Sequence, residues 1–158
     1  MLIREAAPSD TEAACDVVRR SITELCTLDH QGDRATLDAW LANKTPEVFA
    51  DWATSERHIA LVAEVNGRIA AYGLLSRSGT VALLYLAPEA RLQGASRALL
   101  AEMEARARQL GLSALNLSSS ATARRFYERC GFVTNGPPES GFGASTCFPM
   151  VKQLANAA

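Results

Sequence analysis

The stretch VALLYLAPEARLQGASRALLAEMEARARQLG, residues 81–111, decides the fold. It begins with an apolar run typical of a buried strand, passes through a short turn, and then takes the spacing of an amphipathic helix. The pattern predicts a helix from about residue 92 to 110, with one buried stripe formed by Leu92, Ala95, Leu99, Met103, Ala107 and Leu110. Two ion pairs are expected on its exposed side, Glu102 with Arg106 and Glu104 with Arg108.

The turn between this strand and helix, residues 91–96, is rich in small side chains and carries Arg91. A helix N-terminus presents unpaired backbone N–H groups and partial positive charge, and small side chains let a phosphate approach them closely. The turn is therefore a candidate pyrophosphate site. Neither G-x-x-x-x-G-K-[ST] nor G-x-G-x-x-G occurs in the chain, which excludes the nucleoside-triphosphatase loop and the dinucleotide fingerprint.

Two motifs in this region resemble those of one family. The pattern Arg-x-x-Gly-x-Ser at 91–96, after a strand ending at Pro88, resembles motif A of the GNAT superfamily of acyl-CoA-dependent N-acyltransferases. Residues 123–132, ARRFYERCGF, resemble that family's N-A-x-x-F-Y-E-x-x-G-F segment. The two motifs together, in order, are far more specific than either alone. The resemblance covers roughly residues 1–154 and implies one N-acetyltransferase domain there, followed by a short tail at 155–158.

The remaining patterns agree with this fold. Helical spacing is predicted from Pro8 to about 25, around 37–41 and from Pro46 to 52, with a polar break at 29–33. Strand patterns begin near 58, and Asn66-Gly67 predicts a two-residue hairpin turn. Further strands are expected at 1–5, 113–118, 131–134 and 145–154, with a short helix at 120–130 and a loop at 136–143. We expect an α/β (α+β mixed) fold whose central sheet has about seven mostly antiparallel strands and helices on both faces.

The resemblance implies a set of cofactor-binding residues: Leu86, Ala87, Arg91, Leu92, Gln93, Gly94, Ala95, Ser96, Arg97 and Thr122. Leu86 would direct its backbone N–H at the thioester carbonyl, and Arg91 and Arg97 would bring charge to the pyrophosphate. Three of these positions depart from the family pattern: Ser96 replaces Gly or Ala, Leu92 replaces a frequent Gly, and Thr122 replaces an Asn.

Tyr127 is the predicted catalytic residue, because the family's tyrosine at this position commonly protonates the departing coenzyme A thiolate. The alternative is a tyrosine that only packs beside its neighbours on a short helix. The general base stays open. Some members use a carboxylate at the start of the fourth strand, but residues 78–81 offer none, which leaves Glu24, Asp29, His30 or a water chain.

The expected function is transfer of acetyl from acetyl-CoA to a primary amine of a small molecule or peptide, by direct attack. A non-catalytic acyl-CoA-binding sensor or interaction module on the same fold is the alternative, and the three departures and the missing carboxylate of the fourth strand favour it. Acylation of a protein or a charged tRNA is a third possibility. The acceptor is expected to contact segments 20–55 and 135–145, where Phe142 could wall the acceptor site or serve a dimer contact.

Composition limits the partners. The chain has 158 residues and a formal charge of -1, which gives no reason to expect nucleic acid or an anionic membrane. No apolar run has the length of a membrane span or signal peptide. The four cysteines lack C-x-x-C spacing and the two histidines lie far apart, so no metal site is expected and reduced cytoplasmic thiols are the simplest interpretation. A homodimer is plausible from the fold.

Overall fold

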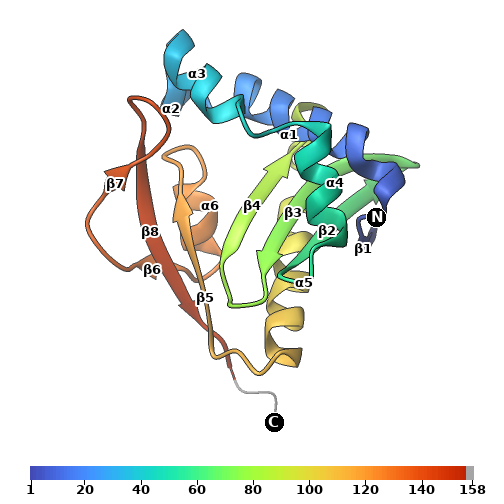
Figure 1. Cartoon of the computed structure of the whole chain (residues 1–158). Coiled ribbons are helices and arrows are strands. Elements are labelled where there is room, and N and C mark those ends of the chain that lie inside the picture. Colours follow the sequence, from blue (N-terminus) through green and yellow to red (C-terminus); the bar gives the residue numbers. More distant parts are fainter. Residues whose placement is uncertain (156–158) are drawn as a thin grey trace.

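The computed structural model describes residues 1–155, in which eight strands form two sheets (Figure 1). Residues 156–158 of the expected tail lie outside the described residues. The first sheet is antiparallel in the order β1 (Leu2–Glu5), β2 (His58–Val65), β3 (Arg68–Ser76) and β4 (Val81–Leu86). In the second, β8 (Thr146–Gln153) pairs with β5 (Ala114–Ser119), β6 (Val133–Thr134) and β7 (Glu139–Ser140).

The helices lie between and after these strands. Four precede β2: α1 (Thr11–Leu25), α2 (Thr27–His30), α3 (Arg34–Leu41) and α4 (Pro46–Thr54). Helix α5 (Ala95–Gln109) joins the sheets, and α6 (Arg124–Arg129) follows β5. Short 3₁₀ turns precede α1 (Pro8–Asp10) and follow β4 (Pro88–Ala90). The predicted polar break at 29–33 is shorter than expected, because α2 continues to His30.

Helices cover both faces of the first sheet (Figure 1). Strand β2 alternates, with Leu61 and Ala63 in the core shared with α5 and Ala60 and Val62 in the core shared with α1 and α4. A strand buried on both faces reads as a continuous apolar run, which is the pattern of residues 59–63. The predicted α/β fold, mostly antiparallel with helices on both faces, is confirmed.

Within residues 1–155 a single isolated bridge links the two sheets. Thr80 and Asn116 form an isolated parallel bridge, and the Asn116 N–H donates to Gly79 O at 2.9 Å. Gly79 has φ +105°, and a Cβ there would lie 3.0 Å from Ala114 O, so glycine permits this close approach. Beyond the bridge β4 and β5 diverge (Figure 1), which opens the space where the site lies.

The predicted start of α5 is wrong. The helix begins at Ala95, and Leu92 is fully exposed in the preceding turn with φ +65°, a left-handed conformation that no helical residue adopts. Leu110 lies just past the helix and is 39% exposed, so the buried stripe is shorter than expected.

Of the two expected ion pairs on α5, the Glu102–Arg106 pair is confirmed at 2.9 Å. The Glu104–Arg108 pair is wrong. Glu104 Oε1 lies 2.6 Å from Lys152 Nζ of β8, and Arg108 donates to Ala155 O.

Candidate active site

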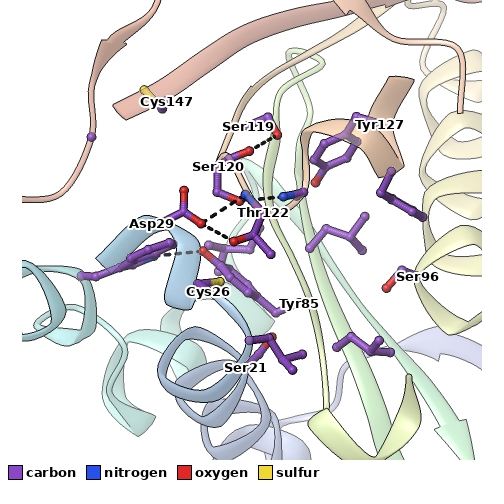
Figure 2. Close-up of a pocket in the computed structure, with 18 of the residues that line it drawn as sticks. Ser21, Cys26, Asp29, Tyr85, Ser96, Ser119, Ser120, Thr122, Tyr127 and Cys147 are labelled. Carbon is purple, nitrogen blue, oxygen red and sulfur yellow. Dashed lines mark hydrogen bonds between the residues drawn. The ribbon is translucent and has the colours of Figure 1, made fainter. Parts of the chain in front are cut away.

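A cavity of about 610 Å³ lies where β4 and β5 diverge (Figure 2). Strand β4 forms its floor, the end of α1 and α2 form one wall, and the turn before α5 forms another. Helix α6 and the segment 141–147 close the remaining sides. Elements from both sheets therefore contribute to one cavity.

The β4 backbone offers unpaired N–H groups to this cavity. Ala87 N–H donates to Ala70 O at 2.8 Å, and the register pairs Tyr85 with Tyr72. Because N–H groups of successive strand residues point to opposite edges, Tyr85 N–H faces β3 and those of Leu84 and Leu86 face the diverging side. Leu86 N–H is thus directed away from β3, whereas Ala87 N–H is used within the sheet.

The turn before α5 presents a second group of free donors. Gly94, at the helix N-cap, has φ +82°, and no side chain caps this end. The first helical hydrogen bond runs from Ala98 N–H to Gly94 O, so Ala95, Ser96 and Arg97 have no helical acceptor for their N–H groups. Positive φ values at Leu92 and Gly94 curl the backbone into a concave array of N–H groups that suits an anion.

The residues expected to bind cofactor are placed as follows. The cavity lining includes Leu86, Arg91, Leu92, Ser96 and Thr122, and Tyr127 as well. Gln93, Gly94 and Arg97 are exposed beside it, while Ala87 and Ala95 are buried and lie outside the lining.

Tyr127 enters the cavity from α6 (Figure 2). Its ring packs edge-on against Phe126 and Phe132, at centroid distances of 5.3 Å and 5.5 Å. No hydrogen bond is recorded between its hydroxyl and residues 1–155, so the hydroxyl is available to a bound molecule. Burial raises the pKa of Tyr127, with a smaller contribution from Cys130, which keeps the phenol protonated near neutral pH. The ring of Tyr127 is therefore packed against its neighbours, while its hydroxyl faces the cavity.

The segment between β5 and α6 is tied to α2. Asp29 Oδ1 accepts from Ala121 N–H at 2.7 Å, and Oδ2 accepts from Thr122 N–H at 3.2 Å and from the Thr122 hydroxyl (Figure 2). Thr122 therefore lines the cavity with its own polar groups already engaged. This contact was not predicted, because nothing local in the sequence links residues 92 positions apart.

Three aromatic side chains that contact one another, Trp40, Tyr85 and Phe142, form part of the cavity wall. Trp40 Nε1 donates to Tyr85 Oη at 3.0 Å, and Phe142 stacks on Trp40 at 5.8 Å with an interplanar angle of 16°. Lys44 is only 2% exposed and covers Phe142 with Nζ 5.0 Å from the ring centroid. All three aromatic residues line the cavity, so Phe142 walls it rather than standing free. Tyr85 and buried Lys44 gave no functional signal in the sequence.

The three candidate bases, Glu24, Asp29 and His30, differ in whether they line the cavity and in whether their polar atoms already accept hydrogen bonds. Glu24 lines the cavity, is exposed, and has its nearest cation, Arg20, at 3.6 Å. Asp29 also lines it, but both of its oxygens accept hydrogen bonds. His30 is buried outside the lining, with Nδ1 accepting from Gly32 N–H at 3.0 Å and Nε2 3.1 Å from Thr23 O. The structure contradicts His30 as a base facing the acceptor.

Two further kinds of feature are absent from residues 1–155. No group of three or more His, Cys, Asp and Glu side chains could hold a metal ion. None of the described helices is both long enough and apolar enough to cross a membrane.

Several solved structures share this fold at low identity. A GCN5-related N-acetyltransferase from Rhodopseudomonas palustris aligns with TM-score 0.86 and 21% identity, over 97% of this chain and 95% of that one. The PaiA N-acetyltransferase from Thermoplasma acidophilum, solved with coenzyme A, aligns at 0.79 and 20%, over 97% and 98%. The ribosomal-protein-S18-alanine N-acetyltransferase from Escherichia coli aligns at 0.72 and 20%, over 99% and 96%.

Sequence comparison identifies the family. No curated protein matches the chain significantly. The model of the acetyltransferase (GNAT) domain family matches residues 27–154, which is most of the chain and includes every wall of the cavity except the end of α1. Together with motif A at 91–96 and the segment 123–132, this match shows that the chain belongs to the GNAT family of acetyltransferases.

Proposed function

We propose that this protein transfers acetyl from acetyl-CoA to a primary amine of a small molecule or peptide. The observation that carries the proposal is the convergence, in one cavity, of three groups: the free N–H edge of β4, the uncapped N-terminus of α5, and the Tyr127 hydroxyl. Acyl transfer from a thioester needs a polarised carbonyl, a held cofactor and a proton for the leaving thiolate. We treat residues 1–154 as one catalytic domain, since both sheets line this cavity.

The cofactor is assigned to the side of the cavity formed by β4 and α5. The pyrophosphate would bind the N–H groups of residues 92–97, with Arg91 adding positive charge and the Ser96 hydroxyl an extra donor. The thioester carbonyl would accept from Leu86 N–H. Gln93, Gly94, Ala95 and Arg97 would act mainly through the backbone or through long-range charge.

The reaction is a direct attack. The amine nitrogen bonds to the thioester carbon, the C–S bond breaks, and the electron pair leaves on sulfur. Tyr127 donates its proton to that thiolate, and the amine loses a proton to Glu24 or to water. A raised tyrosine pKa makes the phenol a weaker acid, but the same dry surroundings make the thiolate a stronger base. No thiol nucleophile is needed: burial raises the pKa of Cys26 to about 12, which disfavours its thiolate.

Two features support a cytoplasmic protein that acts on small amines or peptides. Its cysteines are all free thiols, which suits a reducing compartment. Its net charge of -1 gives no footprint for nucleic acid.

Calorimetric titration with acetyl-CoA tests the cofactor site. We expect saturable binding by the wild type, and at least tenfold weaker binding by Arg91→Glu, because that change places a negative charge beside the pyrophosphate. Arg77→Glu is the matched control: the same change of charge at an exposed turn outside the cavity, expected to leave the affinity unchanged. Absence of binding at millimolar acetyl-CoA would refute the proposal.

Release of free thiol then tests turnover. Thiol release that depends on an added primary amine supports the transferase. Saturable binding with no thiol release across an amine panel supports the alternative, a non-catalytic acyl-CoA-binding module. The occupied polar groups of Thr122 and the exposed Leu92 are the features that favour this alternative.

A further inference from the structure

The strongest unassigned feature is the carboxylate of Asp29. It lies on α2, in the half of the protein built on the first sheet, and binds the segment just before α6 in the other half. It accepts from two successive backbone N–H groups, Ala121 at 2.7 Å and Thr122 at 3.2 Å, and from the Thr122 hydroxyl. Figure 2 shows these bonds beside the cavity. A carboxylate with this many donors is held firmly in place.

A short chain of contacts leads from Asp29 to Tyr127. The segment that Asp29 holds continues into Ala123, whose N–H donates to Ser120 Oγ at 3.1 Å. Ala123 O in turn accepts from Tyr127 N–H at 3.1 Å, in the first turn of α6. Helix α6 has only six residues, so its position is set by the segment at its start and by ring packing.

Asp29 is poorly arranged for a more direct role. Both of its oxygens already accept from neighbouring donors, which leaves little capacity to take a proton from an amine. The hydrogen bonds of the Asp29 carboxylate all go to residues 121–122, in the loop that precedes α6 and Tyr127.

We propose that Asp29 is a positioning residue: by fixing residues 121–123 it holds the Tyr127 hydroxyl in place across the divergence of the two sheets. The expected effect on kcat rests on the proposed function. The expected fixing of residues 121–123 rests on the geometry alone. The Thr80–Asn116 bridge joins the sheets near the start of β4 and β5. Asp29 contacts the segment that follows β5, so it would set the separation of the two halves beside the cavity.

The test uses Asp29→Asn, which keeps the size of the side chain. The carboxylate uses one oxygen for Ala121 and the other for Thr122, whereas the amide has a single oxygen and an NH₂ donor, so in the observed geometry one of the two residues loses its acceptor. We expect kcat to fall 10- to 100-fold because a displacement of about 1 Å has such an effect on rate. The KM for acetyl-CoA should change less than threefold. Asp10→Asn is the control: Asp10 also accepts from a backbone N–H, that of Ala7 at 2.6 Å, but lies outside the cavity.

A double-mutant cycle separates positioning from general weakening of the fold. If Asp29 acts through Tyr127, Asp29→Asn should reduce kcat less than threefold further in the Tyr127→Phe variant, because that variant has no hydroxyl to position. A reduction of the same size in both backgrounds would overturn the inference.

Amide hydrogen exchange gives a readout that does not depend on turnover. In Asp29→Asn we expect faster exchange across residues 121–127, with α1 and β2 unchanged. Unchanged exchange at 121–127 would overturn the inference even if the enzyme is active. Faster exchange there, in a protein that releases no thiol with any amine, would refute the proposed function and support the structural role of Asp29.

Discussion

Single side chains decide the proton transfers of the proposed reaction, and Tyr127 is the clearest of them. Its ring is held by Phe126 and Phe132, while its hydroxyl lies at the cavity and has no hydrogen-bond partner among residues 1–155. The apolar ring contributes to packing and the hydroxyl is free for chemistry, so the two contributions can be separated by removing one atom.

Tyr127→Phe keeps the ring and removes the proton donor. We expect kcat for amine-dependent thiol release to fall 10²- to 10⁴-fold, the usual contribution of a positioned general acid, with the KM for acetyl-CoA little changed. Tyr72→Phe is the control, since the Tyr72 hydroxyl is buried away from the cavity and has no hydrogen-bond partner in the described part of the chain, residues 1–155. Equal rates for Tyr127→Phe and the wild type would leave Tyr127 as a packing residue.

Lys44 shows how burial can control the charge of one residue. It is almost fully buried, donates to Trp40 O at 3.1 Å and Asn43 Oδ1 at 2.6 Å, and has no carboxylate partner in any recorded ion pair of residues 1–155. Burial lowers the pKa of Lys44 from 10.5 to about 8, with a smaller effect of Arg19. The unfolded chain therefore binds more protons between these two pH values, and stability should rise with pH across that window.

Lys44→Met removes this dependence while keeping the length of the side chain. The free energy of unfolding of the wild type, relative to the variant, should increase by up to about 3 kcal/mol between pH 7 and pH 10.5. Urea unfolding of both proteins across that range measures the difference, in which the other titrating groups largely cancel. A difference that stays constant with pH would show that Lys44 keeps an ordinary pKa.

At the scale of elements, residue types predicted correctly those turns whose backbone conformation depends on the residues themselves. Asn66 and Gly67 form the predicted hairpin turn, because both adopt the positive φ that these residue types favour. The start of α5 was misplaced because Leu92 fits the apolar spacing while its backbone is left-handed, which the pattern does not report. The two-residue strand β7 is too short for any periodicity, and it was predicted as loop.

The loop between β7 and β8 walls the side of the cavity that we propose for the acceptor. Ala144 N–H donates to Thr36 Oγ1 at 3.0 Å, and a Cβ on Gly143 would lie 2.5 Å from Thr36, so the loop sits directly on α3. Phe142 is held between Trp40 and Lys44. These contacts join residues 36–44 to residues 142–144 and could not be read from either segment alone.

Phe142→Ala should therefore change the choice of amine and not the use of cofactor. We expect kcat/KM for the preferred amine to fall about 10- to 100-fold, because an aromatic wall is lost, while bulkier amines lose less. The KM for acetyl-CoA should stay within twofold, since α5 lies elsewhere in the cavity. Leu28→Ala, on an exposed residue of α2 outside the lining, is the control. An unchanged acceptor profile would place the acceptor away from this loop.

At the scale of the whole molecule, the fold and its motifs were predictable and the contacts between its halves were not. The order of elements and the motifs at 91–96 and 123–132 identified the fold, because each depends on residues close in sequence. Asp29 with Thr122, Lys152 with Glu104, and the burial of Lys44 depend on residues brought together only by folding. His30 had the chemistry of a base, but its position in the folded chain excludes it.

The cavity draws its walls from both sheets, which are joined within residues 1–155 by the Thr80–Asn116 bridge and by the contacts of Asp29. A cofactor bound there would contact both halves, and any ligand that binds only the folded state stabilises it by an amount that grows with the logarithm of the ratio of ligand concentration to Kd. At acetyl-CoA 100 times its Kd we expect a gain of about 2.7 kcal/mol, or a rise in Tm of roughly 5–10 °C for a chain of this size. Thermal unfolding followed by circular dichroism measures it, with Arg91→Glu losing most of the rise and Arg77→Glu keeping it. A Tm that does not change at saturating acetyl-CoA would mean that the cofactor does not bind this fold.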